Sequence, residues 1–340
     1  MRLFYIFTNS PGEVFAWVKP LVARLNTEFP KSNIFVFLTP CQYSTGQEHD
    51  VCSSFNNVVF VYRPMDTIKT IINPKFEKGI VFYMGGDPFY PKRFAKKTGS
   101  LLIGYSENKL STKGFDLLIF KSKYLDLMVS GLKPMSLDLR AKAVLLPGSR
   151  SEHLDVALPM MLKIADNSIA FDVMLSPFTT PNLLESLNLK YPNINFRILK
   201  NSNDLASYKF AITIPGTNTM QLAFLNIPFL MIFPTHESKI LRLNGFLGLL
   251  LYIPLFGLIL KRIILSLAIK WTRFYALPNK QLNKEVCPEL VGKFSLETAK
   301  KLWSQFVLDR TGYDSCIKEL AYFNETKDPL DDVIRFIKMS

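Results

Sequence analysis

Short apolar runs, rich in β-branched and aromatic residues, alternate with helix-like segments along most of this 340-residue chain. Such alternation is typical of βαβ units and of parallel sheets covered by helices. The series runs through the first half and restarts after a join at 131–142. We therefore predict an α/β protein with two Rossmann-like domains that face a cleft. The predicted strands are 3–8, 33–38, 57–62, 79–84, 101–105 and 116–120, then 143–148, 171–176, 194–199, 210–215 and 228–233.

The pattern also predicts the domain limits. Residues 1–140 form the N-terminal domain, 141–294 form the C-terminal domain, and 295–340 read as three closing helices. A helix is expected over 14–29, because its apolar residues fall on one face. Pro20 interrupts this pattern, so the helix either kinks there or begins later.

The chain carries 41 basic and 28 acidic residues, a net charge of +13. This balance favours an anionic partner, such as nucleic acid, a phosphorylated substrate or an anionic membrane. No basic face or nucleic-acid module is recognisable, which argues against nucleic acid.

Four cysteines without CxxC spacing favour neither a zinc site nor a disulfide framework. The N-terminal apolar run is too short for a signal peptide, so we expect a cytoplasmic location. Only three histidines are present, which argues against a histidine metal centre, and His153 and His236 read as incidental.

Segment 237–275 departs from the βαβ pattern. Eighteen residues without charge lie between Arg242 and Lys261, close to the roughly 20 that a spanning helix needs. Glycines and Pro254 interrupt the segment, and basic residues flank it. These features predict insertion into the interface of an anionic membrane. A buried pair of core helices or a single transmembrane span are the alternatives.

Three strand-to-helix turns carry residues suited to ligand binding. At 8–21, the turn Pro11-Gly12-Glu13 places a carboxylate at the carboxyl end of the first strand, where ligands bind in open α/β sheets. At 145–154, Pro147-Gly148 precedes a capping box from Ser149 to Glu152, and Arg150 adds an anion-binding fork. At 214–233, Pro215-Gly216 precedes a helix that Thr217 or Thr219 caps, with Gln221 one turn inside it. Both of the later turns suit a phosphate, although each is also compatible with a plain βα connection.

Two further stretches are less specific. In YMGGDPFYPKRF (83–94), Asp87 follows two glycines at a strand end and is either a general base or the cap of the next helix. In YALPNKQLNKEVCPEL (275–290), Asn279 and Glu289 are polar candidates near turns.

Taken together, LLPGSRSEH, PGTNTMQLAFLNIPFLMIF and ALPNK…CPEL resemble the bacterial lipid-A-disaccharide synthase family in order and rough spacing. The opening NSPGEVFAW is similar to that family's Gly-Glu loop, and closer to a divergent related branch. The resemblance covers most of the chain, more clearly after residue 143. It implies the GT-B fold and a metal-independent, inverting transfer of a sugar, such as an N-acetylglucosamine derivative, from a UDP-sugar to a lipid acceptor. It implies no bound cofactor and a peripheral or monotopic place on the cytoplasmic face of the membrane.

By position, the resemblance implies two groups of site residues. On the acceptor side it implies Gly12, Trp17 and the two candidate bases Glu13 and Asp87. Trp17 would either pack the first helix to the sheet or stack on an acceptor sugar. The nucleotide-sugar side would comprise Gly148, Ser149, Arg150, Gly216, Thr217, Thr219, Gln221, Asn279 and Glu289.

The chain also departs from the family pattern. Phe15-Ala16-Trp17 stands near the place of Ser-Gly-Asp, Gln221 stands where the family has Glu, and the Gln after Pro-Glu-Leu is missing near Gly292. Two other functions therefore stay open. One is a UDP-sugar epimerase or hydrolase of the same fold. The other is a catalytically inactive, membrane-bound protein that binds a nucleotide sugar or a lipid.

Overall fold

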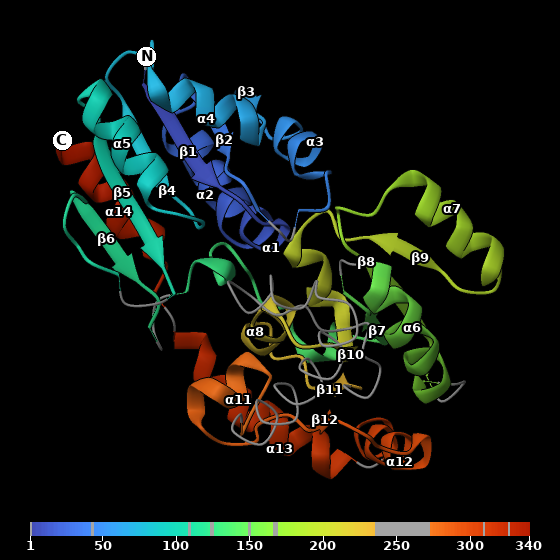
Figure 1. Ribbon diagram of the computed structural model, residues 1–340. Coiled ribbons are helices and arrows are strands. Elements are labelled where there is room, and N and C mark those ends of the chain that lie inside the picture. Colours follow the sequence, from blue (N-terminus) through green and yellow to red (C-terminus); the bar gives the residue numbers. More distant parts are fainter. Residues whose placement is uncertain are drawn as a thin grey trace, which may run out of the picture. The chain divides into compact units, whose positions relative to one another are not determined.

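The computed structural model describes residues 2–41, 44–107, 110–122, 126–148, 151–165, 169–234, 273–308, 310–325 and 327–340. They form two compact units, Met1–Gly131 with Glu325–Ser340, and Leu132–Asn324 (Figure 1). Each unit contains one six-stranded sheet, and every strand pairing that joins these strands is parallel. The predicted α/β class and the two parallel sheets are therefore confirmed.

The first sheet has the order β3-β2-β1-β4-β5-β6. Its strands are β1 (Leu3–Thr8), β2 (Asn33–Leu38), β3 (Val58–Tyr62), β4 (Ile80–Tyr83), β5 (Leu101–Ser106) and β6 (Leu117–Phe120). The chain builds outward from β1 in one direction and from β4 in the other. The order of connection thus reverses between β1 and β4, and their carboxyl ends form the switch point of this unit.

The second sheet repeats this plan in the order β12-β11-β10-β7-β8-β9. Its strands are β7 (Lys142–Leu146), β8 (Phe171–Leu175), β9 (Phe196–Ile198), β10 (Tyr208–Thr213), β11 (Phe229–Phe233) and β12 (Glu289–Val291). The switch point of this unit lies between β7 and β10. All eleven predicted strands are confirmed, whereas the pattern did not predict the three-residue β12.

Helices alternate with these strands. In addition to the helical segments that directly follow β1, the first unit contains α3 (Glu48–Ser53), α4 (Pro64–Ile72), α5 (Phe89–Thr98) and α14 (Pro329–Met339). The second unit contains α6 (Ser151–Ala165), α7 (Pro181–Lys190), α8 (Thr217–Phe224), α11 (Leu277–Leu282), α12 (Leu296–Val307) and α13 (Arg310–Leu320). Short 3₁₀ turns lie at Leu127–Val129, Leu137–Leu139, Ser202–Ser207 and Ala321–Glu325.

Aromatic side chains fill the core beneath α4 and α5. Phe37 stacks on Phe7 at 4.6 Å and on Tyr62 at 4.4 Å between ring centroids. Phe94 of α5 lies 5.2 Å from Phe37, and Ile71 of α4 belongs to the same buried cluster. The helices therefore hold one face of the sheet through large rings.

The helix after β1 starts earlier than predicted and contains a wider turn. It runs through α1 (Pro11–Glu13), a π-helical segment (Val14–Val18) and α2 (Lys19–Glu28). Lys19 N–H donates to the Val14 carbonyl, five residues back, immediately before Pro20. Proline has no N–H and its ring crowds the preceding turn, so we attribute the wider turn to Pro20.

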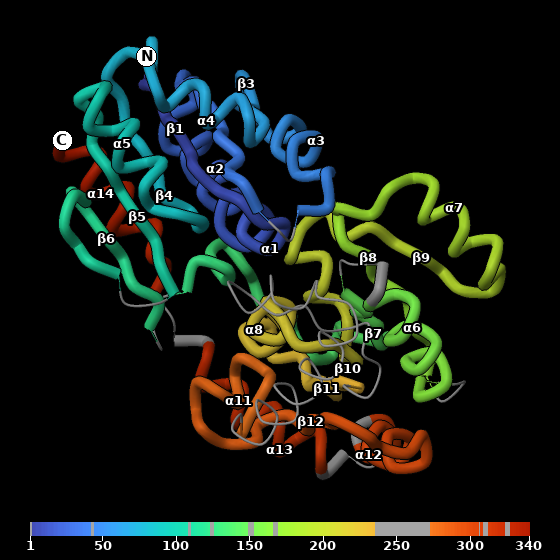
Figure 2. The backbone as a smooth tube through the Cα atoms, in the orientation of Figure 1, coloured from blue at the N-terminus to red at the C-terminus, as the bar shows by residue number. Residues whose placement is uncertain are grey.

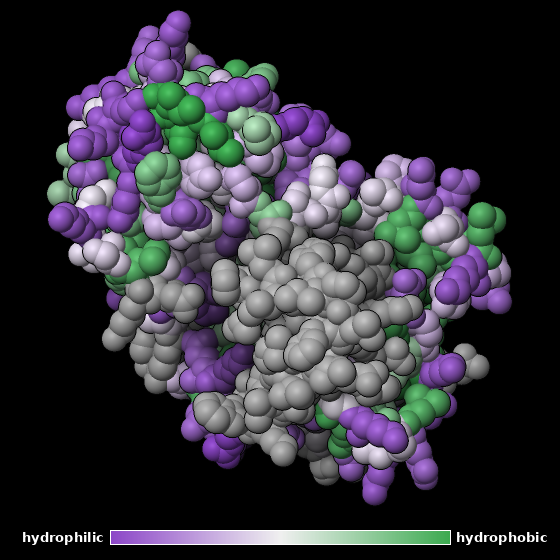
Figure 3. Space-filling view, viewed as in Figure 1, coloured by the Kyte–Doolittle hydropathy of each residue, from purple (hydrophilic) through white to green (hydrophobic). Residues whose placement is uncertain are grey.

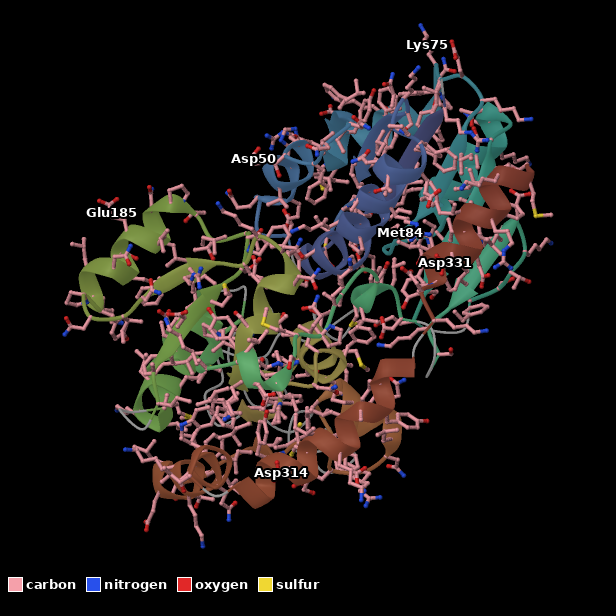
Figure 4. All side chains as sticks on the ribbon, turned by 180° about the vertical axis from the view of Figure 1, so that it is seen from behind. Asp50, Lys75, Met84, Glu185, Asp314 and Asp331 are labelled. Atoms are coloured by element: carbon pink, nitrogen blue, oxygen red, sulfur yellow. The ribbon has the colours of Figure 1, made fainter. Side chains whose placement is uncertain are left out.

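The last helix, α14, belongs to the first unit, although the sequence grouped it with the other closing helices. Arg24 of α2 contacts Asp331 at 2.7 Å, and Arg2 donates to the Ile337 carbonyl at 2.8 Å. The tube in Figure 2 shows α14 beside β5 and β6, and Figure 4 labels Asp331 on it. Val333 and Ile337 are buried in this contact, so both apolar and ionic contacts anchor the helix.

Candidate active site

The strand ends at the switch point of the first unit carry a carboxylate and a pair of glycines. Thr8 ends β1 and is followed within five residues by Glu13, while Tyr83 ends β4 and is followed by Gly85 and Gly86. β1 and β4 are hydrogen-bonded neighbours with Phe7 opposite Tyr83. The turn after β1 therefore lies beside the glycine pair, near Met84 in Figure 4.

Glu13 closes this turn as a capping box. The Ser10 N–H donates to its carboxylate at 3.1 Å, and the Glu13 N–H donates to the Ser10 hydroxyl at 3.3 Å. The carboxylate occupies the place that a side chain at Gly85 would need. A Cβ there would lie 2.2 Å from the Glu13 carboxyl carbon and 2.4 Å from each oxygen. Gly85 also has φ +102°, a conformation that favours glycine. Glu13 and Gly85 therefore fit each other as a pair.

Burial changes the acidity of this carboxyl group. Removal from water raises the pKa of Glu13 from 4.5 to about 7, against hydrogen bonds from Ser10 that lower it. The Glu107 carboxylate raises it further. A carboxyl group with a pKa near neutrality exchanges a proton readily at physiological pH, which suits a general base.

Asp87, the other candidate base, has different surroundings. Its side chain is exposed and accepts a hydrogen bond from the Phe89 N–H at 2.8 Å, at the start of α5. The contact is a local one that precedes α5, because the N-cap position of that helix is Pro88 and no side chain caps it. Asp87 still lies at the same sheet edge as Glu13, since it follows β4.

The other two residues predicted on the acceptor side, Trp17 and Gly12, differ in their exposure to solvent. Trp17 is 8% exposed and packs edge-on against Tyr105, with centroids 5.3 Å apart. Of the two roles left open for it, packing is the one that this contact supports. Gly12 is exposed, and the nearest atom to a Cβ there would be the Ser10 hydroxyl at 3.9 Å.

A charged cluster at the ends of β5 and β6 was not predicted. Lys121 contacts both Glu107 and Asp126 at 3.1 Å, and the Tyr105 hydroxyl donates to Asp126 at 3.3 Å. Although burial lowers it, these two carboxylates raise the pKa of Lys121 overall. The signal in the sequence was only that charged residues follow two strand ends. The cluster places Glu107 close enough to influence Glu13 electrostatically.

The second unit brings together two predicted Pro-Gly turns. β7 and β10 are neighbours with Leu146 opposite Thr213, so Gly148 and Gly216 follow adjacent strand ends. Gly216 precedes α8 with φ +154° and ψ −171°, and among the described residues, its two chain neighbours apart, no atom lies within 4 Å of the Cβ position there. Backbone at this place is therefore open to a ligand. Ser149 and Arg150 lie outside the described residues.

The predicted side chains on α8 are mostly engaged within the unit. Thr217 is partly buried, whereas Thr219 is fully buried. Thr219 donates to the Gly216 carbonyl at 2.7 Å and accepts from the Leu277 N–H at 3.1 Å. Gln221 is 1% exposed and donates to the Ser202 hydroxyl at 3.0 Å. Thr219 and Gln221 thus brace the turn that presents Gly216.

Asn279 and Glu289 form one internal network. The Asn279 side chain donates to the Cys287 carbonyl at 2.7 Å and to Glu289 at 2.8 Å, and accepts from the Val286 and Cys287 N–H groups. Glu289 also accepts from the N–H groups of residues 275 and 276, at the start of α11. These contacts hold α11 to β12, which explains why the two motifs occur together.

The predictions of a membrane-associating segment and of no metal centre can be compared with the described residues only. Most of the apolar segment 237–275 lies outside the described residues, which resume at Arg273. Within the described part of the chain, no helix combines the length and apolar character needed to cross a membrane. Among those same residues, no group of three or more His, Cys, Asp or Glu side chains is placed to hold a metal ion.

Comparison with known proteins identifies the architecture. No protein-family model and no curated protein matches the sequence. Among solved structures, MurG from Acinetobacter baumannii has 10% identity and a TM-score of 0.52, with 100% of both chains covered. Glycosyltransferase VinC in complex with dTDP has 9% identity and a TM-score of 0.53, over 99% of this chain and 98% of that one. The fold is of the GT-B type. A putative UDP-N-acetylglucosamine 2-epimerase from Listeria monocytogenes has 11% identity and a TM-score of 0.51, over 93% of this chain and 90% of that one.

Proposed function

We propose that this chain is a membrane-associated glycosyltransferase resembling lipid-A-disaccharide synthase. It moves a sugar, such as an N-acetylglucosamine derivative, from a UDP-sugar to a lipid-linked acceptor with inversion. The observation that carries this proposal is the partly buried Glu13 carboxylate at the switch point of the first unit, confined against Gly85, with its pKa raised to about 7. A base of this kind suits removal of a proton from an acceptor hydroxyl.

The reaction balances as a direct displacement. Glu13 takes the proton of the acceptor hydroxyl while that oxygen forms a bond to the anomeric carbon of the sugar. The bond between the anomeric carbon and the phosphate oxygen breaks, and its electrons leave with UDP. The open backbone at Gly216 and the start of α8 bind the diphosphate, with Arg150 of the preceding turn neutralising its charge.

The surface of the first unit supports a lipid acceptor. Met65 and Ile72 of α4 are 64% and 59% exposed, and Phe60 of the edge strand β3 is 53% exposed. Figure 3 shows hydrophobic side chains gathered over this part of the first unit. Lys97 of α5 donates to the Ile72 carbonyl, so a basic residue lies beside the apolar ones. Apolar side chains with basic neighbours suit an anionic membrane surface, in addition to the predicted role of 237–275.

The exposed apolar surface of the first unit favours this proposal over its two alternatives. An epimerase or hydrolase of this fold also needs the nucleotide turns, and one fold neighbour is a putative epimerase. Such an enzyme acts on a water-soluble compound and has no use for an exposed apolar face. A catalytically inactive binding protein has no use for a carboxylate that is partly withdrawn from water at the switch point, because that desolvation costs stability.

Donor binding tests the first half of the proposal. Thermal unfolding of the full chain is measured with UDP, UDP-N-acetylglucosamine, UDP-glucose, dTDP and ADP, and repeated with Arg150→Ala. We expect stabilisation by uridine nucleotides that the substitution removes. A folded protein that none of these compounds stabilises would contradict the donor assignment.

Transfer tests the second half. Membranes are incubated with the protein and UDP-N-acetylglucosamine labelled in the sugar, and the lipid phase is counted. We expect label in lipid for the wild type, none for Glu13→Gln, and retained transfer for Asp87→Asn. Label that appears instead in a 2-epimer of the donor, or in free sugar, would establish the epimerase or hydrolase alternative.

A further inference from the structure

The turn after β7 contains a side chain that the sequence marked as incidental. His153 lies in the first turn of α6, and its ring occupies the space beside Gly148. A Cβ at Gly148 would lie 2.8 Å from Nδ1 of His153 and 2.5 Å from Cδ1 of Ile214. Gly148 has φ +101°, so glycine is required there both by the backbone and by the imidazole.

This position is the switch point of the second unit. Ile214 directly follows β10, and Gly148 follows β7, so the imidazole lies where two adjacent strand ends meet. Two residues further along, Gly216 has open space beside its backbone. An imidazole therefore lies beside Gly148 at this strand edge, and no described side chain fills the space beside the neighbouring Gly216.

The choice of side chain is informative. His153 is only partly buried, and its Nδ1 lies, with Cδ1 of Ile214, against the position that a Cβ at Gly148 would take. An aliphatic side chain would fill the space beside Gly148 equally well, but it would bring no hydrogen-bond donor to the strand edge. An imidazole always keeps at least one N–H, and a hydrogen bond to a phosphate oxygen is charge-assisted.

We propose that His153 is a binding residue that contacts the diphosphate of the nucleotide sugar in the second unit. This inference rests on the proposed function and adds to it a ligand contact that the sequence comparison did not suggest. The other histidine in the described residues differs, because His49 lies on α3 of the first unit and pairs with Asp50 at 3.0 Å.

The direct test is nuclear magnetic resonance of the imidazole nitrogens in the full chain. The sequence has only three histidines, so three ring systems are observed, and His153→Gln assigns the one of interest. Addition of UDP-N-acetylglucosamine should shift the His153 resonances and leave those of His49 in place. UDP-N-acetylglucosamine is suitable because its diphosphate does not titrate near neutral pH.

Binding by variants gives an independent measurement. The loss of one hydrogen bond to a charged group weakens affinity on the order of tenfold or more. We expect this loss for His153→Leu, a smaller loss for His153→Gln, which keeps a donor, and none for the matched control His49→Gln. Nucleotide binding by the wild type without any shift at His153, together with unchanged affinity in His153→Leu, would overturn the inference and leave the proposed function intact. No uridine nucleotide binding by the wild type would overturn both.

Discussion

Replacement of Glu13 by Gln should stabilise the protein above neutral pH while it abolishes transfer. The folded state raises the pKa of Glu13 from 4.5 to about 7, so the protonated form is the one that the fold favours. The stability that this carboxyl group contributes is therefore fully present below pH 4.5 and is lost as the pH rises through about 7. Gln is neutral at every pH and retains an oxygen that accepts the Ser10 N–H.

The size of the effect follows from the shift. A difference of about 2.5 pKa units corresponds to about 3 kcal/mol at 1.36 kcal/mol per unit. At pH 8 ionisation of Glu13 lowers the free energy of unfolding of the wild type by nearly all of this amount, whereas at pH 5 it lowers it by less than about 1 kcal/mol. With about 2–4 °C per kcal/mol for a unit of this size, Glu13→Gln should unfold roughly 6–12 °C higher than the wild type at pH 8.

Urea and thermal unfolding at pH 5, 6, 7 and 8 measure this difference. Asp87→Asn is the matched control, because that side chain is exposed and Asn keeps the acceptor for the Phe89 N–H. The same variants assayed for transfer should show a wild-type rate that rises with pH through about 7. Equal stability of Glu13→Gln and wild type at pH 8, or a gain that is the same at pH 5, would refute the buried ionisation at this position.

Three other substitutions test contacts of the site. Gly85→Ala should lower the free energy of unfolding by about 1–3 kcal/mol for the positive φ, and by a further amount for the clash with Glu13. Urea unfolding should show a smaller decrease when the same substitution is made in Glu13→Ala. Equal decreases in the two backgrounds would mean that the two residues are not in contact. Asn279→Ala should lower the free energy of unfolding by about 3 kcal/mol, because it leaves buried backbone groups unsatisfied; a loss well under 1 kcal/mol would contradict the network. Lys121→Met should lower the free energy of unfolding by about 3–5 kcal/mol at pH 7, because Asp126 is left buried without its cation. This decrease should become smaller at low pH, where Asp126 is protonated. A decrease that is the same at low pH would contradict the explanation.

The alternating pattern predicted most of the fold because short apolar runs of five or six residues and the glycine turns between them are local signals. Every strand of five or more residues was found, and so were the two Pro-Gly turns that flank the second switch point. The three-residue β9 was found because it lies inside the longer predicted run 194–199, whereas β12 was missed because Glu289–Val291 stands between Pro288 and Gly292 with no such run around it. Its place at the sheet edge depends on the network of Asn279 and Glu289, which forms only after the chain has folded.

The candidate site was predictable as a set of strand ends but not as a set of contacts. Glu13 was recognised because it follows Pro-Gly at the end of a strand. Its burial depends on Gly85, which lies more than seventy residues further along the chain. The pair of Lys121 with Glu107 likewise joins two different strands. His153 is closer in sequence to the turn at Gly148, but the space beside Gly148 is also bounded by Ile214, which comes from another strand end.

The structure also separates two carboxylates that the sequence could not rank. Glu13 and Asp87 both follow a strand of the first sheet and both stand beside glycine, so local pattern treats them alike. Asp87 accepts the Phe89 N–H and faces water. Glu13 is confined against Gly85, and the fold bears the cost of its ionisation. A protein that only needed a helix cap after β1 would gain stability from Gln at this position. An acid at this position, in place of Gln, is therefore in keeping with the proton transfer that we propose for Glu13.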